Sequence, residues 1–114
     1  MKASYYHSIT LMANMLDQAN IPYQYTGRSA LFVQGVDIDQ YKNIDIDVQW
    51  DVFNEALDLF SEYAPTKPER SPETAFFLMD VEGVSATVHC RFNTTIKTDP
   101  YRLSIKMGDT EVWC

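Results

Sequence analysis

The segment Asn43–Val48 alternates between apolar and carboxylate side chains, and this pattern constrains the fold more than any other stretch of the sequence. Successive side chains of a β-strand point to opposite faces, so a strand here would bury its isoleucines and valine and present Asp45 and Asp47 on the other face. Two residues of extended chain span about 6.5 Å, which lets the two flexible carboxylates converge on one divalent cation. A half-buried strand with an ordinary solvated face gives the same alternation, so the pattern leaves both interpretations open.

The composition sets the size of the protein and the partners that suit it. The chain has 114 residues, of which 46% are hydrophobic, and this predicts one compact domain over residues 1–114 with a single core. The formal net charge of −7 argues against tight binding to a nucleic-acid backbone, because such binding requires clustered lysine and arginine. A small or cationic partner fits this charge better.

The cysteine content and the hydropathy pattern indicate the cellular setting. The chain has only two cysteines, Cys90 and Cys114, and no N-terminal apolar run behind basic residues, which predicts a reducing, cytoplasmic environment. No stretch approaches the ~18 consecutive apolar residues that a membrane span requires, so we expect no membrane partner.

Apolar residues at helical spacing predict three helices, over residues 3–19, 29–34 and 51–64. Asn20 suits a left-handed cap after the first helix, and Asp51 suits the N-cap of the third. Runs of β-forming residues bounded by turn residues predict strands at 23–26, 43–48, 74–81 and 84–92, and a closing hairpin of 101–107 with 110–114. The predicted fold class is therefore α/β, a mixed sheet flanked by helices with a C-terminal β-hairpin.

The segment Glu82-Gly83 predicts the register between the third and fourth of these strands. A two-residue hairpin loop pairs Val81 with Val84 and Leu78 with Thr87. Thr87 then lies on the polar face of its strand.

The residues Gly27-Arg28-Ser29 follow the strand at 23–26 as a glycine turn that opens a helix. A strand, a glycine turn opening a helix, and a strand with Asp-x-Asp together resemble the nucleotidyltransferase-fold superfamily, in particular its small bacterial members. The resemblance covers roughly residues 21–92. It matches Gly27 and Arg28 to the Gly-Gly or Gly-Ser turn of the family, and Asp45 and Asp47 to its metal-binding aspartates.

The resemblance implies an Mg²⁺-dependent transfer of a nucleoside monophosphate from a nucleoside triphosphate to a small-molecule or protein acceptor. Asp45 and Asp47 would hold the Mg²⁺ and act as catalytic residues, and Gly27, Arg28 and Ser29 would bind the nucleotide phosphates. Free N–H groups and the helix dipole favour an anion at such a turn, although a glycine turn before a helix is also a common simple connection. Arg28 stands where the family usually has a small residue, so its guanidinium either binds a phosphate or closes the site by its bulk.

Active members of the family generally carry a third carboxylate on a later strand, and the alignment places Thr87 at that position. A threonine hydroxyl is a poor substitute for a metal ligand or general base. Asp80 lies a diagonal step from Thr87 on the same predicted face, which makes it the candidate third metal ligand or, alternatively, an ordinary polar residue near a hairpin end. The departure at Thr87 leads to an alternative function, a catalytically degenerate module that binds a nucleotide or a protein partner.

Two further features bear on the site and on assembly. Asp37 and Asp39 have the same spacing as Asp45 and Asp47, but the residues that follow them read as a loop, so we select the second pair. Trp113 and Cys114 end the closing hairpin with an apolar edge, which favours coverage by a partner or by a second copy of the chain in a homodimer.

Overall fold

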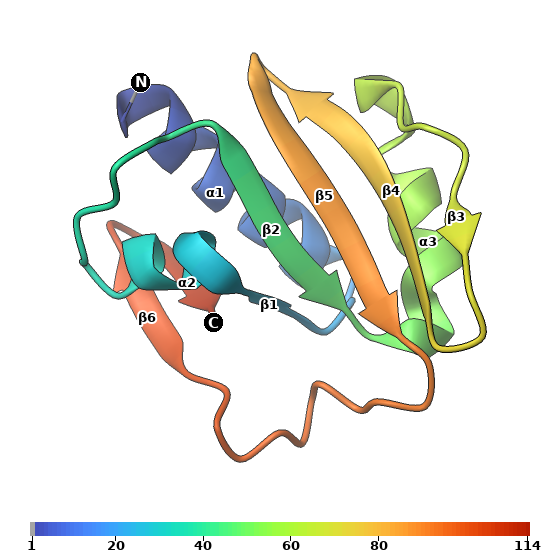
Figure 1. Ribbon diagram of the computed structural model, residues 1–114. Helices are drawn as coiled ribbons and strands as arrows, with labels where there is room; N and C mark the ends of the chain where they lie inside the picture. Colours follow the sequence, from blue (N-terminus) through green and yellow to red (C-terminus); the bar gives the residue numbers. More distant parts are fainter. Residues whose placement is uncertain (1) are drawn as a thin grey trace.

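The computed structural model describes residues 2–114, and Figure 1 shows its helices packed around a twisted sheet. The elements, in chain order, are α1 (Lys2–Gln18), β1 (Tyr23–Tyr25), α2 (Gly27–Val33), β2 (Asn43–Val48), the 3₁₀ helix η1 (Trp50–Val52), α3 (Phe53–Leu59), the 3₁₀ helix η2 (Ser61–Tyr63), β3 (Glu69–Arg70), β4 (Thr74–Val81), β5 (Val84–Arg91), β6 (Ser104–Met107) and β7 (Thr110–Trp113).

Five strands form a mixed sheet in the order β1-β2-β5-β4-β3. The central strands β2 and β5 run parallel, and the other neighbouring pairs run antiparallel. The remaining strands, β6 and β7, form a separate antiparallel hairpin at the C-terminal end of the chain. The predicted α/β class, with a mixed sheet, helices and a C-terminal β-hairpin, is confirmed.

The hydrophobic core lies between this sheet and the helices α1 and α3, which Figure 1 shows on one side of it. The apolar stripe of α1 is fully buried and consists of Tyr5, Ile9, Met12, Ala13 and Leu16. The strands β2 and β5 contribute their alternate apolar residues to the same core. Because side chains alternate along a strand, the polar residues of β2 and β5 share the opposite face, away from α1 and α3.

The predicted hairpin register is confirmed, with Val81 paired to Val84 and Leu78 to Thr87. The turn residues explain why this register forms. Glu82 and Gly83 have φ angles of 52° and 90°, as a type I′ turn requires, and this turn matches the twist of the two strands. The left-handed cap at Asn20 is also confirmed, with a φ of 58°.

The third helix differs from its prediction. Asp51 lies inside η1 and does not cap α3; its carboxylate instead accepts a hydrogen bond of 2.9 Å from the side-chain amide of Gln49. The predicted range 51–64 is thus divided into η1, α3 and η2, and Ala64 ends it with a left-handed φ of 50°. Helical periodicity cannot separate these pieces, because 3₁₀ turns place apolar residues at nearly the same spacing.

The segment between α3 and β4, for which the sequence predicts no regular element, contains the short edge strand β3. Glu69 pairs with Phe76, and Arg70 pairs with Ala75. A strand of two residues is too short to show an alternating pattern, which is why the sequence gives no sign of it.

The C-terminal hairpin packs on the rest of the chain and does not extend the main sheet. Met107 and Val112 are buried in the core. The guanidinium of Arg102 lies over the ring of Trp113, 4.0 Å from its centroid. The apolar end of the chain, for which coverage by a partner was predicted, is therefore covered in part by the chain itself. Within residues 2–114, none of the helices combines the length and the apolar character needed to cross a membrane.

Candidate functional site

The candidate site lies on the polar face of the two central strands. Asp45 and Asp47 are partly exposed there and alternate with the buried residues Ile44, Ile46 and Val48. The side chain of Asp47 is more enclosed than that of its neighbour His89, with 18% of its surface exposed compared with 32% for His89. The structure thus places both predicted aspartates on one accessible face of β2.

The helix predicted to begin at Ser29 begins two residues earlier, at Gly27, with Thr26 as its N-cap. Thr26 and Gly27 form a sharp turn out of β1, which we call the Gly27 turn, and it comes close to Asp45. The backbone N–H of Thr26 donates a 3.0 Å hydrogen bond to the carbonyl oxygen of Asp45. Gly27 has a φ of +56°, and a Cβ placed on it would lie 3.7 Å from Oδ2 of Asp45. Because Gly27 has no side chain, the carboxylate of Asp45 and the backbone of the turn face each other with nothing between them.

A cavity of about 370 Å³ opens between this turn and the sheet, and we refer to it as the carboxylate pocket. Its lining residues are Thr26, Gly27, Asp45, Ile46, Asp47, Thr87, His89 and Arg91. A second cavity of about 240 Å³ adjoins it and shares Thr26, Asp47 and Arg91 with it. The site therefore offers adjoining spaces on either side of Asp47, enough for a ligand with more than one part.

Ser29, predicted to bind phosphate, faces the protein interior. Its side chain is fully buried, and its hydroxyl accepts a 2.9 Å hydrogen bond from the backbone N–H of Asp45. The same hydroxyl lies 2.7 Å from the hydroxyl of Tyr5, which donates to the carbonyl oxygen of Asn43. The hydroxyl of Ser29 thus holds the backbone of β2 beneath Asp45 and is turned away from the carboxylate pocket.

Arg28 projects from the surface and forms an ion pair with Asp39, a member of the Asp37/Asp39 pair in the loop before β2. Its Nη1 lies 3.0 Å from Oδ1 of Asp39, and both side chains are more than half exposed. Arg28 does not line the carboxylate pocket. Its bulk therefore leaves the pocket open in this structure, and its charge is compensated elsewhere.

The strand register fixes the positions of Thr87 and Asp80. Thr87 pairs directly with Asp45 across the parallel strands, so a threonine holds the place beside the aspartates. Asp80 lies on β4 at the end of the hairpin, two strands away from β2, or about 10 Å at ordinary strand spacing. Its Oδ1 accepts a 2.8 Å hydrogen bond from the backbone N–H of Gly83. The structure does not bring Asp80 to Asp45 and Asp47.

No group of three or more histidine, cysteine, aspartate or glutamate side chains in the described part of the chain, residues 2–114, is arranged to hold a metal ion. The carboxylate pocket supplies two carboxylates. Mg²⁺ is commonly bound in proteins by one or two carboxylates, with substrate phosphates and waters completing its coordination. The donor set fits an Mg²⁺ ion that arrives with a phosphorylated ligand.

His89 and Arg91 belong to the site, although neither is among the site residues predicted from the sequence. His89 pairs with Asp47 in the strand register, and its Nδ1 lies 3.4 Å from Oδ1 of Asp47. Arg91 lines both adjoining cavities. The alternation of β5 puts Thr87, His89 and Arg91 on one face, and this was the signal that could have identified both residues.

The carboxyl group of Asp47 has a raised pKa. Burial is the main cause, because it penalises the charged form, and the neighbouring charge of Asp45 acts in the same direction. His89 and Arg91 oppose this shift by favouring the carboxylate. A cation near Asp47 would remove part of the cost of its charge, so the site as built gains from binding one.

Comparisons of the chain with protein-family models, with curated proteins and with solved structures found no match.

Proposed function

We propose that the protein binds an Mg²⁺ complex of a nucleotide in the carboxylate pocket, as a nucleotidyltransferase-like module. The observation that carries this proposal is the contact between the Gly27 turn and Asp45, with Asp47 next along the same face of β2. A phosphate group placed between the turn and the aspartates would meet backbone N–H groups on one side and a shared metal ion on the other.

Each side chain of the pocket has a distinct part in this binding. Asp45 and the oxygen of Asp47 that is turned away from His89 would be the protein ligands of Mg²⁺. Arg91 would provide the positive charge for the phosphates that the sequence suggested for Arg28, because Arg91 lines the pocket and Arg28 is paired with Asp39. The adjoining cavity beyond Asp47 would take the remaining part of the nucleotide or an acceptor.

Binding without transfer is the form of this function that the register supports best. Thr87 stands opposite Asp45, where the family resemblance requires a third carboxylate. A hydroxyl has no negative charge with which to neutralise a metal ion, and it is a much weaker base than a carboxylate at neutral pH. A module with two aspartates can hold a metal–nucleotide complex without activating an acceptor.

The experiment that tests binding is calorimetric titration of ATP, GTP, CTP and UTP into the protein, each with and without Mg²⁺. We expect at least one nucleotide to bind only with Mg²⁺, and Asp45→Asn/Asp47→Asn to weaken that binding by about tenfold or more. The matched control is Asp37→Asn/Asp39→Asn, which removes the same two charges at the same spacing from the loop before β2 and should leave affinity unchanged. Absence of binding by all four nucleotides would overturn the proposal.

A second candidate function is nucleotidyl transfer, and the pairing of His89 with Asp47 favours it. In this reaction an acceptor hydroxyl attacks the α-phosphorus, the bond to the β-phosphate oxygen breaks, and pyrophosphate leaves. His89, oriented by Asp47, would accept the proton of the attacking hydroxyl in place of the third carboxylate. Mg²⁺ would supply charge stabilisation for the phosphates.

The measurement that separates the two candidates is release of pyrophosphate with a broad panel of small-molecule and protein acceptors. Release that His89→Asn abolishes, with nucleotide affinity retained, would establish transfer. Mg²⁺-dependent binding with no release from any acceptor would establish the binding module.

A further inference from the structure

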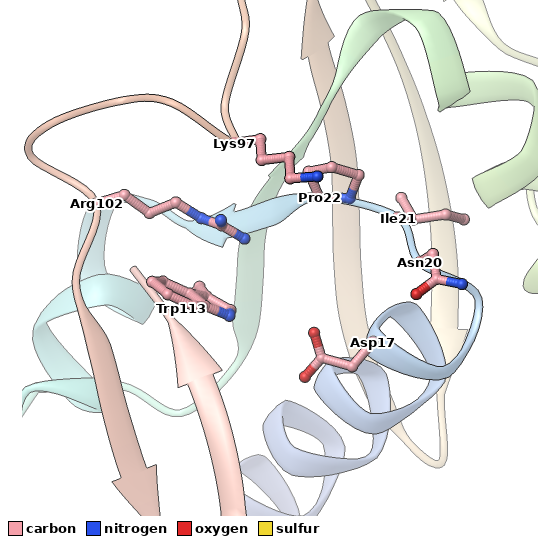
Figure 2. A pocket seen from close by; sticks show the side chains of 7 residues that line it. All are labelled: Asp17, Asn20, Ile21, Pro22, Lys97, Arg102 and Trp113. Carbon is pink, nitrogen blue, oxygen red and sulfur yellow. The ribbon is translucent and has the colours of Figure 1, made fainter.

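A third cavity, also lined by charged side chains, lies beside the irregular segment 92–103. This cavity, of about 210 Å³, opens where the end of α1, the linker before β1, residues of that segment and β7 meet, and we refer to it as the Arg102 pocket (Figure 2). Its lining residues are Asp17, Asn20, Ile21, Pro22, Lys97, Arg102 and Trp113. It shares none of them with the carboxylate pocket.

Arg102 is held firmly at one wall of this pocket. Its Nε and Nη2 donate hydrogen bonds of 3.1 Å and 2.8 Å to the carbonyl oxygen of Tyr23. One face of the guanidinium is stacked on the ring of Trp113. These contacts leave Nη1 without a protein acceptor among residues 2–114, so the planar group presents a fixed N–H edge to a ligand.

Asp17 stands at the opposite wall, at the end of α1, and Figure 2 shows its carboxylate directed into the pocket. It forms no ion pair within residues 2–114, and neither does Lys97. Burial raises the pKa of the Asp17 carboxyl, Glu111 raises it further, and Arg102 lowers it. The Asp17 carboxylate therefore interacts electrostatically with Arg102 across the pocket without contacting it.

The position of Lys97 is fixed by its backbone. Its N–H donates a 3.3 Å hydrogen bond to Oε1 of Gln49, which ties segment 92–103 to the end of β2. Figure 2 shows the Lys97 side chain lying beside Pro22 in the pocket lining. The pocket lining thus combines two cations, Arg102 and Lys97, with the carboxylate of Asp17 and with apolar surface from Ile21, Pro22 and Trp113.

We propose that the Arg102 pocket binds a free α-amino acid, with the ligand carboxylate on Arg102 and Lys97 and its ammonium group on Asp17. A small zwitterion can contact the cations and the carboxylate together, whereas a ligand with a single charge contacts only one of these two kinds of group. The volume is below the roughly 300–1,000 Å³ of pockets for drug-sized ligands, which restricts the ligand to a small metabolite. The apolar surface of Pro22 and Trp113 receives its side chain.

The test uses Trp113 as a reporter in the full chain. The protein has two tryptophans, so Trp50→Phe, which changes a partly exposed residue outside the pocket, leaves Trp113 as the only source of tryptophan fluorescence. The twenty standard α-amino acids are added singly at about 10 mM, and both fluorescence and thermal midpoint are recorded. At least one amino acid should shift both signals, and absence of any shift across the set would overturn the proposal.

The amino acid that binds is then compared with its N-acetyl and its amide derivatives, which lack one charge each. Both derivatives should bind about tenfold or more weakly. Equal binding of either derivative would show that one wall is not used and would overturn the zwitterion assignment.

Substitutions locate the site. Asp17→Asn and Lys97→Gln should each weaken binding by about tenfold, while the matched changes Asp58→Asn and Lys67→Gln, at exposed residues outside the pocket, should not. The Arg102 side chain is left unchanged because its contacts to Tyr23 and Trp113 also support the fold. Binding that survives both pocket substitutions would place the amino acid elsewhere and overturn the proposal.

Discussion

Ser29 shows how a single buried hydroxyl positions a functional side chain without touching a ligand. It accepts the backbone N–H of Asp45 and contacts the hydroxyl of Tyr5, which in turn donates to Asn43. These bonds join α1, α2 and β2 under the carboxylate pocket. Serine in a turn before a helix was interpreted as a phosphate ligand, because sequence does not show which way a small hydroxyl points; the network shows that its hydroxyl is committed to the interior.

Ser29→Ala is expected to lower the free energy of unfolding by about 1–3 kcal/mol, because it leaves the partly buried N–H of Asp45 without an acceptor. Urea denaturation measures the change. The control is Ser61→Ala at an exposed position of η2, which should alter stability by less than about 0.5 kcal/mol. Equal effects of the two substitutions would contradict this role for Ser29.

Asp47→Asn is expected to stabilise the protein at neutral pH. The native pKa of Asp47 is raised by burial, so the native state holds the proton more tightly than the unfolded chain. The favourable contribution of Asp47 is then complete below the unfolded pKa of about 3.9 and is lost as pH rises through the raised native pKa. Asparagine avoids that loss.

Urea denaturation between about pH 3 and pH 7 measures the Asp47 prediction. The gain from Asp47→Asn should be largest at pH 7 and shrink toward low pH, while Asp58→Asn on the exposed face of α3 should show no such gain. Destabilisation by Asp47→Asn at pH 7 would mean that the attraction of the Asp47 carboxylate to His89 and Arg91 outweighs the cost of its burial.

At the scale of elements, the predictable parts were those with a strict local rule. The β4–β5 register followed from the two-residue turn, and β2 followed from its alternation. The division of residues 51–64 into three short helices, and the edge strand β3, depend on packing and on pairing with β4, which no local pattern records. The carboxylate pair and the Gly27 turn could be predicted because they lie on regular elements. His89 and Arg91 can be recognised as site residues only from the pairing of β5 with β2.

Gly27→Ala tests the turn between β1 and α2. Alanine at a positive φ costs about 1–2 kcal/mol, and the new Cβ would lie 3.7 Å from Oδ2 of Asp45, inside the carboxylate pocket. Gly35→Ala is the matched control, since Gly35 has a φ of +87° and open space around it. Both variants should lose similar stability in urea, but only Gly27→Ala should weaken Mg²⁺-nucleotide binding. Equal affinities of the two variants for the Mg²⁺-nucleotide complex would show that the Gly27 turn does not contribute to binding.

Asp80→Ala tests the assignment of Asp80 to the hairpin turn. Loss of its 2.8 Å hydrogen bond to the N–H of Gly83 should cost about 0.5–1.5 kcal/mol in urea denaturation. Nucleotide affinity, measured by calorimetry, should not change. Asp109→Ala, in the turn between β6 and β7, is the charge-matched control and should have little effect on either property. A loss of Mg²⁺-dependent nucleotide binding in Asp80→Ala but not in Asp109→Ala would show that Asp80 takes part in metal binding.

At the scale of the whole molecule, the net charge of −7 acts on stability. Like charges on a domain of this size repel, and the compact state bears more of this repulsion than the extended chain. Salt screens these interactions over distances beyond about 10 Å at 0.1 M ionic strength.

Raising NaCl from about 10 mM to about 500 mM at pH 7 is therefore expected to increase the thermal midpoint by roughly 2–4 °C, as followed by circular dichroism. The same series near pH 4.6, the sequence isoelectric point, provides the control, because the net repulsion is absent there. A fall in the midpoint with salt at pH 7 would show that attractive ion pairs dominate instead.

The parallel pairing of β2 with β5 has a consequence for the life of the folded chain. It pairs Asn43 with Ser85 and Asp47 with His89. This pairing can form only after the intervening chain, with α3 and β4, has formed a closed loop, and loop closure costs conformational entropy before the strand contacts stabilise it. A nascent or partly opened chain without β5 in place has lost half of the pocket even if β1, α2 and β2 remain folded. A ligand that contacts both strands would thus bind only the folded chain, stabilise it, and lengthen the half-life of the protein against proteolysis.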